Sequence, residues 1–274
     1  MSQIQELSGR TAIVTGASSG IGRAIAEQLG AKGAHVVLHG RDEAAMDESA
    51  KKIVAAGGAA STVASDIRSP DAMQHLVDTA VSATGQLDIF VNNAGVSYLG
   101  TVLGGTVESW RNMLETNVLA LLVGCQAAVV AMRSKGNPGH IVNVSSVAAL
   151  NPSSGVYGAT KHAVNVITNT LREELLEDQI KLTSVMPGLV ATNIGRNVDP
   201  AIIAGMVAMS GIEAEFIPGE RLPDTVLQGA QVALHDFMIR PEDIANAVVF
   251  AVCQPLDVQV TDIVVRPNKQ INLG

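Results

Sequence analysis

The chain of 274 residues is long enough for one large α/β domain, and two independently folded domains are not expected. Its 18 basic and 26 acidic residues give a formal net charge of −8, and the basic residues are scattered, which argues against a nucleic-acid-binding or anionic-membrane surface. Aromatic residues make up 3% of a chain that is 47% hydrophobic, so the core must consist mainly of small and aliphatic side chains.

Cysteine usage and the apolar stretches indicate a soluble, cytoplasmic protein. Cys125 and Cys253 lie far apart among apolar residues, which predicts two buried free thiols in a reducing compartment. The N-terminal residues lack the basic run followed by an apolar stretch that is typical of a secretory signal. The most apolar run, residues 118–132, is shorter than the roughly 20 residues that a membrane-spanning helix needs.

Short runs rich in β-branched residues recur along the chain and are predicted to form strands. Their apolarity is nearly continuous, which is typical of strands covered on both faces by helices. Segments with helical periodicity separate them, so the pattern predicts a Rossmann-type, doubly wound parallel sheet in a three-layer αβα domain spanning residues 1–274. The predicted strands are residues 11–15, 34–39, 60–65, 88–92, 140–146, 181–186 and 260–265.

Several helix boundaries can also be predicted. Ser69 and Pro70 have the chemistry of an N-cap followed by a first helical residue, and Gly85 should end that helix. The segment 240–243 repeats the signature of a helix start, and residues 107–133 are expected to form one long helix.

Residues 193–239 interrupt the alternation of strands and helices. They contain no strand pattern, three prolines and many apolar residues. So long a connection in an α/β domain is usually functional, and we interpret it as short helices that form a lid over a pocket.

A glycine-rich loop follows the first strand and has the spacing G-x-x-x-G-x-G. Small residues allow the backbone to approach a pyrophosphate, and the N-terminus of the next helix offers free N–H groups. Its position between a strand and a helix favours a nucleotide site over a simple turn. The residues expected to contact the nucleotide here are Gly16, Ser18, Ser19, Gly20, Ile21 and Gly22.

The end of the second predicted strand favours NADP over NAD. An acidic residue there would hydrogen-bond a free ribose 2′-hydroxyl and repel a 2′-phosphate. The sequence instead has Gly40 followed by Arg41, whose guanidinium can hold a phosphate, although Asp42 comes next and NAD remains possible.

Tyr157 and Lys161 lie four residues apart in a segment with helical periodicity, so both should project from one helix face. A nearby ammonium favours the phenolate and would lower the pKa of the phenol from its usual value near 10. Ser145 and Ser146 end a predicted strand upstream, and only one of the two hydroxyls can face the same side as the tyrosine. Asn117 lies in an apolar helix and needs a partner for its amide.

These motifs, in this order, resemble the short-chain dehydrogenase/reductase family. The similarity runs from about residue 8 to the C-terminus and includes the glycine loop, the Asn-Asn-Ala-Gly segment at 92–95, the Tyr157 to Lys161 spacing and Pro187-Gly188. The resemblance implies a seven-stranded sheet in the order 3-2-1-4-5-6-7 and hydride transfer between NAD(P) and a carbonyl or alcohol. The apolar faces of the long helices that begin near Val107 and Gly155 predict a homotetramer or homodimer.

The resemblance also implies residue roles. Tyr157 would exchange the proton, Lys161 would lower its pKa and hold the nicotinamide ribose, Ser146 would orient the substrate oxygen, and Asn117 would anchor a water. No metal is expected. The remaining cofactor contacts would be Asp66 and Ile67 near the adenine, Asn93, Ala94 and Gly95 along the cofactor, and Pro187, Gly188 and Thr192 at the nicotinamide end. Tyr98 is expected to line the pocket.

Two kinds of function remain open at this point. One is an NADP-dependent oxidoreductase that interconverts a carbonyl and a secondary alcohol. The other is a catalytically silent NADP-binding sensor or scaffold on the same fold, although such a protein should have lost Tyr157 or Lys161.

Overall fold

Seven parallel strands form one sheet in the order β3-β2-β1-β4-β5-β6-β7. The computed structural model describes residues 7–69, 71–98, 100–136, 138–197, 203–205, 207–208, 211, 217 and 219–269. The predicted doubly wound sheet is confirmed, and strand ends differ from the predicted ones by at most two residues. The strands are β1 (Thr11–Thr15), β2 (His35–Gly40), β3 (Ala59–Ala64), β4 (Ile89–Asn92), β5 (Gly139–Val144), β6 (Ile180–Pro187) and β7 (Asp262–Val265).

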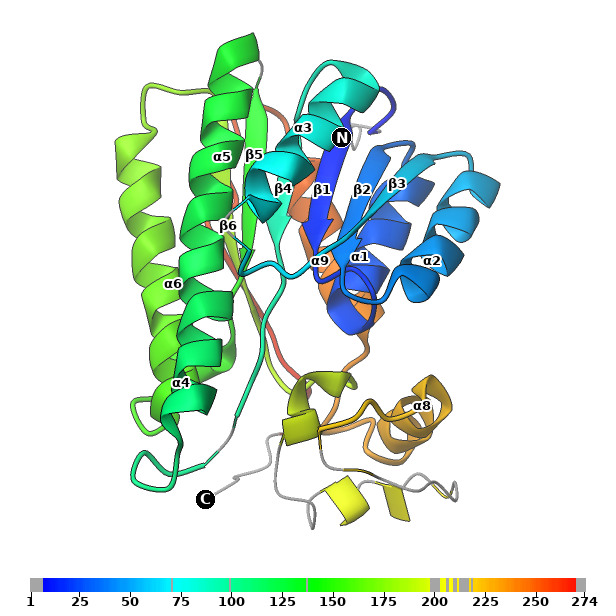
Figure 1. Cartoon of the computed structure of the whole chain (residues 1–274), viewed down its shortest axis with the longest axis vertical. Coiled ribbons are helices and arrows are strands. Elements are labelled where there is room, and N and C mark those ends of the chain that lie inside the picture. The colour runs from blue at the N-terminus through cyan, green and yellow to red at the C-terminus, as the bar shows by residue number, and fades with distance from the viewer. Residues whose placement is uncertain are drawn as a thin grey trace.

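Helices cover both faces of this sheet, as the continuous apolarity of the strands requires. Figure 1 shows α1, α2 and α9 on one side and α3, α5 and α6 on the other. Each side has its own apolar core, with Leu29 and Ile244 in the first and Leu76 and Phe90 in the second. The helices are α1 (Gly20–Ala31), α2 (Glu43–Ala55), α3 (Ala72–Thr84), α4 (Val107–Leu114), α5 (Ala120–Lys135), α6 (Gly155–Glu174), α8 (Asp224–Ala233) and α9 (Pro241–Val252).

One predicted helix start is wrong and two other predicted boundaries are confirmed. Helix α3 begins at Ala72 rather than after Ser69, because the Ala72 N–H donates to the Ser69 carbonyl in a turn that precedes the helix; Pro70 lies outside the described residues. Gly85 ends α3 with φ of +85°, a left-handed conformation that glycine adopts without strain. Helix α9 begins at Pro241, where the Asp243 carboxylate accepts the Arg240 N–H at 2.9 Å.

The predicted long helix is two α-helices joined by a π-helical turn, η1 (Glu115–Leu119). The whole helical run Val107–Lys135 is long and apolar enough to cross a membrane, and half of its most apolar window is buried inside the protein. Core helices of soluble proteins have the same length and composition, so this run by itself does not indicate a membrane protein.

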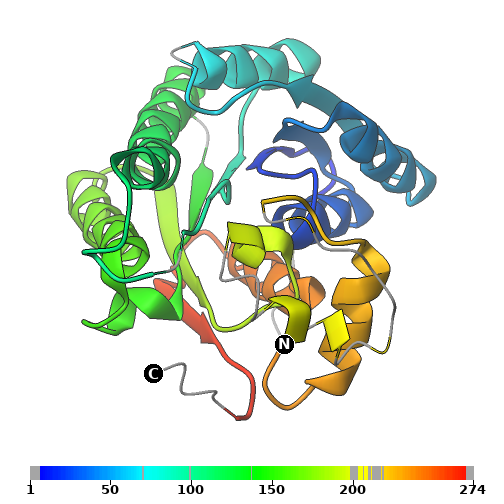
Figure 2. The same cartoon turned by 60° about the horizontal axis from the view of Figure 1, so that its bottom comes forward.

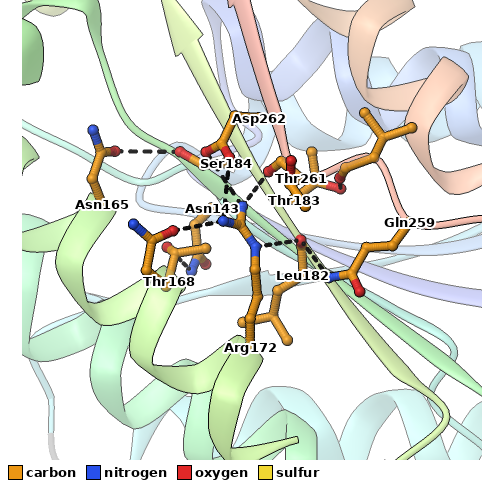
Figure 3. Close-up of polar contacts among 12 residues, drawn as sticks. Asn143, Asn165, Thr168, Arg172, Leu182, Thr183, Ser184, Gln259, Thr261 and Asp262 are labelled. Carbon is orange, nitrogen blue, oxygen red and sulfur yellow. Dashed lines mark hydrogen bonds and ion pairs between the residues drawn. The ribbon is translucent and has the colours of Figure 1, made fainter. Parts of the chain in front are cut away.

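Helix α6 is fixed to the sheet by a polar network at the far end from Tyr157 (Figure 3). Arg172 donates from Nε to the Leu182 carbonyl at 3.1 Å and pairs with Asp262 at 3.2 Å. It also donates to the Thr261 carbonyl. Because these acceptors belong to β6 and to the start of β7, one side chain ties α6 to two strands and fixes the helix that carries the predicted catalytic pair.

The described parts of the segment 193–239 lie beyond the carboxyl ends of the strands, and α8 is below the sheet in the view of Figure 1 (Figures 1 and 2). Its described helical parts include η3 (Asn193–Asn197) and α8, as the absence of strand patterns predicted. A parallel bridge between Val190 and Ile239 closes its base. A small apolar cluster packs within it, formed by Ile203, Leu222, Val226 and Leu227 with Val207.

Candidate active site

The glycine loop after β1 leaves no room for side chains at two of its positions. A Cβ at Gly22 would lie 2.3 Å from the Gly16 carbonyl oxygen, and Gly16 itself has φ of +68°. Helix α1 starts at Gly20, and no side chain caps it. Its first amide groups are therefore available to an anion, and the arrangement fits a pyrophosphate.

Asn93 and Ala94 hold the glycine loop in place. The Asn93 side-chain amide donates to the Thr15 carbonyl at 2.9 Å, and the Thr15 hydroxyl accepts the backbone N–H groups of both residues at 3.0 Å. Sequence reasoning placed these two residues along the cofactor. In the structure their polar groups position the loop, while Gly95 faces Lys161: a Cβ at Gly95 would lie 3.6 Å from Lys161 Nζ.

The strand end at β5 separates the two serine hydroxyls. Ser145 donates to the Lys161 carbonyl at 3.1 Å and is buried. Ser146 accepts the Ala148 N–H at 3.1 Å and lies close enough to the Tyr157 phenol to oppose the rise in its pKa. Only Ser146 therefore faces the tyrosine, which is the arrangement that the alternation of side chains along a strand predicted.

Lys161 is buried with few partners. Its Nζ donates to the Val144 carbonyl at 2.9 Å and lies 6.0 Å from the centre of the Tyr157 ring. Of the three ammonium protons, the other two have no acceptor among the described residues. Buried donors of this kind fit the hydroxyl groups of a ribose.

The two pKa values move in opposite directions. Burial raises the pKa of Tyr157 to about 12, against an opposing contribution from the Ser146 hydrogen bond. Burial lowers the pKa of Lys161 to about 8. The expected lowering of the phenol pKa by Lys161 is absent from this arrangement, because the ammonium is directed at the Val144 carbonyl and burial dominates. The phenol is thus protonated at neutral pH.

Asn117 lies in the π-helical turn η1 and its side chain is fully engaged. Its Oδ1 accepts the Val96 N–H at 2.9 Å, and its Nδ2 donates to the Val96 carbonyl at 2.9 Å and to the Thr160 hydroxyl at 3.1 Å. The partners that the Asn117 amide needs in its apolar surroundings are therefore the backbone of Val96, which follows β4, and the hydroxyl of Thr160 on α6. π-Turns within α-helices are frequent at functional sites. The predicted water anchored by Asn117 stays a prediction.

At the adenosine end, Arg41 donates no hydrogen bond to any of the described residues, whereas Asp66 is already paired. The Asp66 carboxylate binds the Arg68 guanidinium at 2.6 Å, which lowers the pKa of Asp66 to about 2. Ile67 is buried beside it. Any adenine contact of Asp66 would have to share the carboxylate with Arg68, a partner that sequence reasoning did not identify.

The residues predicted to contact the nicotinamide, Pro187, Gly188 and Thr192, lie at or shortly after the carboxyl end of β6. Pro187 is the last residue of β6, and the Gly188 N–H donates to the Val265 carbonyl at 2.8 Å. Thr192 lies over the glycine loop, since a Cβ at Gly20 would be 2.9 Å from its Cγ2. Thr192 therefore also faces the region predicted to hold the pyrophosphate.

An open cavity of about 620 Å³ adjoins the site. Tyr98 lines it, as predicted, and so do Trp110 of α4, Val156 next to the tyrosine, and Asn197 of the segment 193–239. Among the described residues, no group of three His, Cys, Asp or Glu side chains is placed to hold a metal ion. Cys125 and Cys253 are buried free thiols, and burial raises the pKa of Cys125 to about 12.

Sequence reasoning missed two arginines that contact the glycine loop, Arg23 and Arg221, and a third, Arg196, near Arg41. Arg23 of α1 donates to the Ser18 carbonyl at 2.9 Å, Arg221 donates to the same carbonyl at 3.3 Å, and Arg196 lies close enough to Arg41 and Arg221 for their charges to lower its pKa. Arg221 follows Ser18 by 203 residues, and no local motif connects them. Only the fold brings them together.

A Rossmann-type sheet, a glycine loop at an uncapped helix and a tyrosine, lysine and serine at one strand end together define the dinucleotide-binding class of α/β oxidoreductases. Residues 10–202 match the family described as short chain dehydrogenase. The chain belongs to this family and is an oxidoreductase.

Proteins with similar sequences or structures align with nearly the whole chain. An uncharacterized oxidoreductase of Staphylococcus saprophyticus is 34% identical over 265 residues, covering 96% of this chain and 99% of the relative. A metagenomic short-chain oxidoreductase solved in complex with NADP is 30% identical with a TM-score of 0.74, covering 97% and 100% of the two chains. A short-chain dehydrogenase/reductase from Mycobacterium marinum is 28% identical with a TM-score of 0.77, covering 95% of each chain.

Proposed function

We propose that this protein is an NADP(H)-dependent oxidoreductase that interconverts a carbonyl and a secondary alcohol, with Tyr157 as its acid/base residue. The observation that carries the proposal is the convergence of Ser146, Tyr157 and Lys161 at the carboxyl end of β5. A bound nicotinamide would supply or accept the hydride. The protein supplies position and a proton, which are the two things that such a cofactor lacks.

In the reducing direction the phenol acts as the proton donor. Its raised pKa keeps Tyr157 protonated at neutral pH, and its Oη transfers the proton to the carbonyl oxygen as that oxygen gains charge. Ser146 hydrogen-bonds to the same oxygen and fixes its position. Lys161, whose Nζ donates to the Val144 carbonyl, would bind the nicotinamide ribose with its remaining protons.

Two observations support NADP over NAD. Gly40 and Arg41 put no carboxylate at the end of β2 but a guanidinium that donates no hydrogen bond within the described part of the chain, and the metagenomic relative was solved with NADP. We also propose a homotetramer or homodimer and a cytoplasmic location. Exposed apolar residues on α5 and α6, such as Val130 and Val166, support the assembly, and the two buried thiols fit a reducing compartment. A monomeric mass by light scattering at micromolar concentration would contradict the assembly.

The test is a panel of carbonyl compounds assayed by NADPH and NADH absorbance with the wild-type protein and Tyr157→Phe. We expect turnover with NADPH to fall by at least 100-fold in the variant, because the proton donor is removed, while NADP binding stays within about 2-fold. Near wild-type turnover of Tyr157→Phe would remove the proposed mechanism. A wild-type protein that binds NADP but reduces nothing on the panel would favour the silent sensor or scaffold instead.

A further inference from the structure

Arg221 reaches from the segment 193–239 onto the glycine loop. Its Nη1 lies 2.7 Å from Asp42 Oδ2, and its Nη2 lies 3.3 Å from the Ser18 carbonyl oxygen and 3.5 Å from the Ser18 hydroxyl. Asp42 is the first residue after Arg41, so this guanidinium lies at the position where the sequence predicts the adenosine ribose.

The backbone around Arg221 is fixed. The Asn193 side chain accepts the Leu222 N–H at 2.8 Å and donates to the Leu222 carbonyl at 3.1 Å, while the Leu222 side chain packs in the small apolar cluster. Two residues further on, Asp224 pairs with Arg23 at 2.6 Å, and Arg23 also donates to the Ser18 carbonyl. The segment 221–224 is thus joined to the glycine loop at both of its ends.

Positive charge is concentrated around this contact. Burial lowers the pKa of Arg196, and the neighbouring charges of Arg41 and Arg221 lower it further. The Asp42 carboxylate is the ion-pair partner of Arg221 in the described part of the chain. Arg41 and Arg221 both act on Arg196, Asp42 pairs with Arg221, and Asp66 is the carboxylate that Arg41 influences. An additional anion among these guanidinium groups would be stabilised by their charges.

The geometry of the β2 end indicates what kind of anion fits. A Cβ at Gly40 would lie 3.0 Å from Ser18 Cβ, so the strand end and the glycine loop are in close contact, and an acidic side chain at that position would meet the loop. The Ser18 hydroxyl and the Arg221 guanidinium lie at this corner, and Arg41 is the residue that follows Gly40. Guanidinium groups bind phosphate oxygens in pairs, which makes a phosphomonoester a better match than a single carboxylate.

We propose that Arg221 is a specificity-determining residue that binds the 2′-phosphate of NADP(H) together with Arg41, and that Asp42 is the internal anion from which it is released when the phosphate binds. This inference rests on the proposed function, because it assumes a nicotinamide cofactor with its adenosine at the β2 end. It adds that preference for NADP depends on a residue 180 positions after Arg41, in the segment that also borders the substrate cavity.

The experiment is calorimetric titration of wild-type protein and variants with NADP and NAD, and with adenosine 2′-monophosphate against adenosine 5′-monophosphate. For Arg221→Ala we expect the affinity for NADP to fall by roughly 10- to 100-fold while the affinity for NAD changes by less than about 2-fold, because a charge-assisted contact to the 2′-phosphate is lost. Arg221→Lys should recover part of the loss, since it keeps the charge but not the paired geometry.

Asp42→Asn gives a prediction of the opposite sign. Asn keeps the N-cap bond that Asp42 makes to the Ala45 N–H at 3.1 Å, and it removes a negative charge from beside the phosphate. We expect its affinity for NADP to rise by about 2- to 10-fold with NAD unchanged. Arg133→Ala is the matched control, because it breaks an exposed Arg–Asp pair of 2.7 Å at the opposite end of the sheet and should change neither affinity.

The outcomes separate this inference from the proposed function. If Arg41→Ala lowers the preference for NADP but Arg221→Ala lowers both affinities equally, the contact is structural and the inference is overturned alone. If the wild-type protein does not prefer NADP, the cofactor assignment fails and the inference fails with it. Thermal unfolding of each variant shows whether it is folded, and the gain expected for Asp42→Asn remains testable if Arg221→Ala does not fold.

Discussion

The floor of the active site and the segment above it are built in different ways. Around Lys161, side chains are buried and bonded to backbone carbonyls or to other buried groups, as with Asn117 and its three hydrogen bonds. The described part of the segment 193–239 instead forms two exposed ion pairs with the rest of the protein, Arg23 with Asp224 and Arg221 with Asp42, and contains a small apolar cluster.

This difference indicates a division of roles. Buried hydrogen bonds hold Lys161, Asn117 and their neighbours in one geometry, because breaking them would leave polar groups unpaired in the interior. Exposed ion pairs contribute little to stability and exchange partners readily, so they suit contacts that must change when a cofactor or substrate arrives.

The largest expected effect compares one leucine from each region. Leu76 is fully buried in the core on the α3, α5 and α6 side of the sheet. Leu76→Ala should lower the free energy of unfolding by about 3 to 4 kcal/mol, because the dense core cannot close the cavity left by the side chain. Leu222→Ala makes the same chemical change in the small cluster and should cost about 1 kcal/mol, because that cluster can relax. Urea unfolding measures both, and equal losses would show that the two regions form one cooperative unit.

A smaller effect is expected from the titration of Lys161. Its pKa is about 8 when folded and 10.5 in the unfolded chain, so between these values the unfolded state binds more protons and stability rises with pH. The stabilisation is complete above pH 10.5 and is lost as pH falls through 8. Relative to Lys161→Met, the wild-type protein should gain about 2 kcal/mol between pH 7.5 and 10. Urea unfolding at each pH measures the free energy of unfolding of both proteins. If the two free energies changed equally with pH, the pKa of Lys161 would not be lowered in the folded protein.

The smallest effect is expected at the junction of the two regions. Asp224→Ala removes the exposed partner of Arg23 and should change the free energy of unfolding by less than about 1 kcal/mol, an amount that shrinks further at high salt. Chemical unfolding at low and high ionic strength measures it. A salt-independent loss of several kcal/mol would instead place Asp224 among the residues that maintain the fold.

Much of the fold could be predicted from the chain because its signals are local. Apolar runs separated by segments of helical periodicity predicted seven strands close to their observed bounds. Gly85 predicted the end of a helix, where the backbone adopts a left-handed conformation. The start of α3 was wrong because a turn through Ser69 competes with helical capping there. The π-turn at 115–119 has no local sequence signal, and it accompanies tertiary bonds of Asn117.

The sequence by itself determined the residue types of the site and their order: glycines at a strand-to-helix turn, and a tyrosine and a lysine one helical turn apart. Spacing carries this information because helices and strands have fixed periods. Only the tertiary structure decided which serine faces the tyrosine, that burial raises the phenol pKa while lowering that of Lys161, and that Arg221 lies against Ser18. Burial and contacts between distant segments depend on how the whole chain packs, which no local pattern encodes.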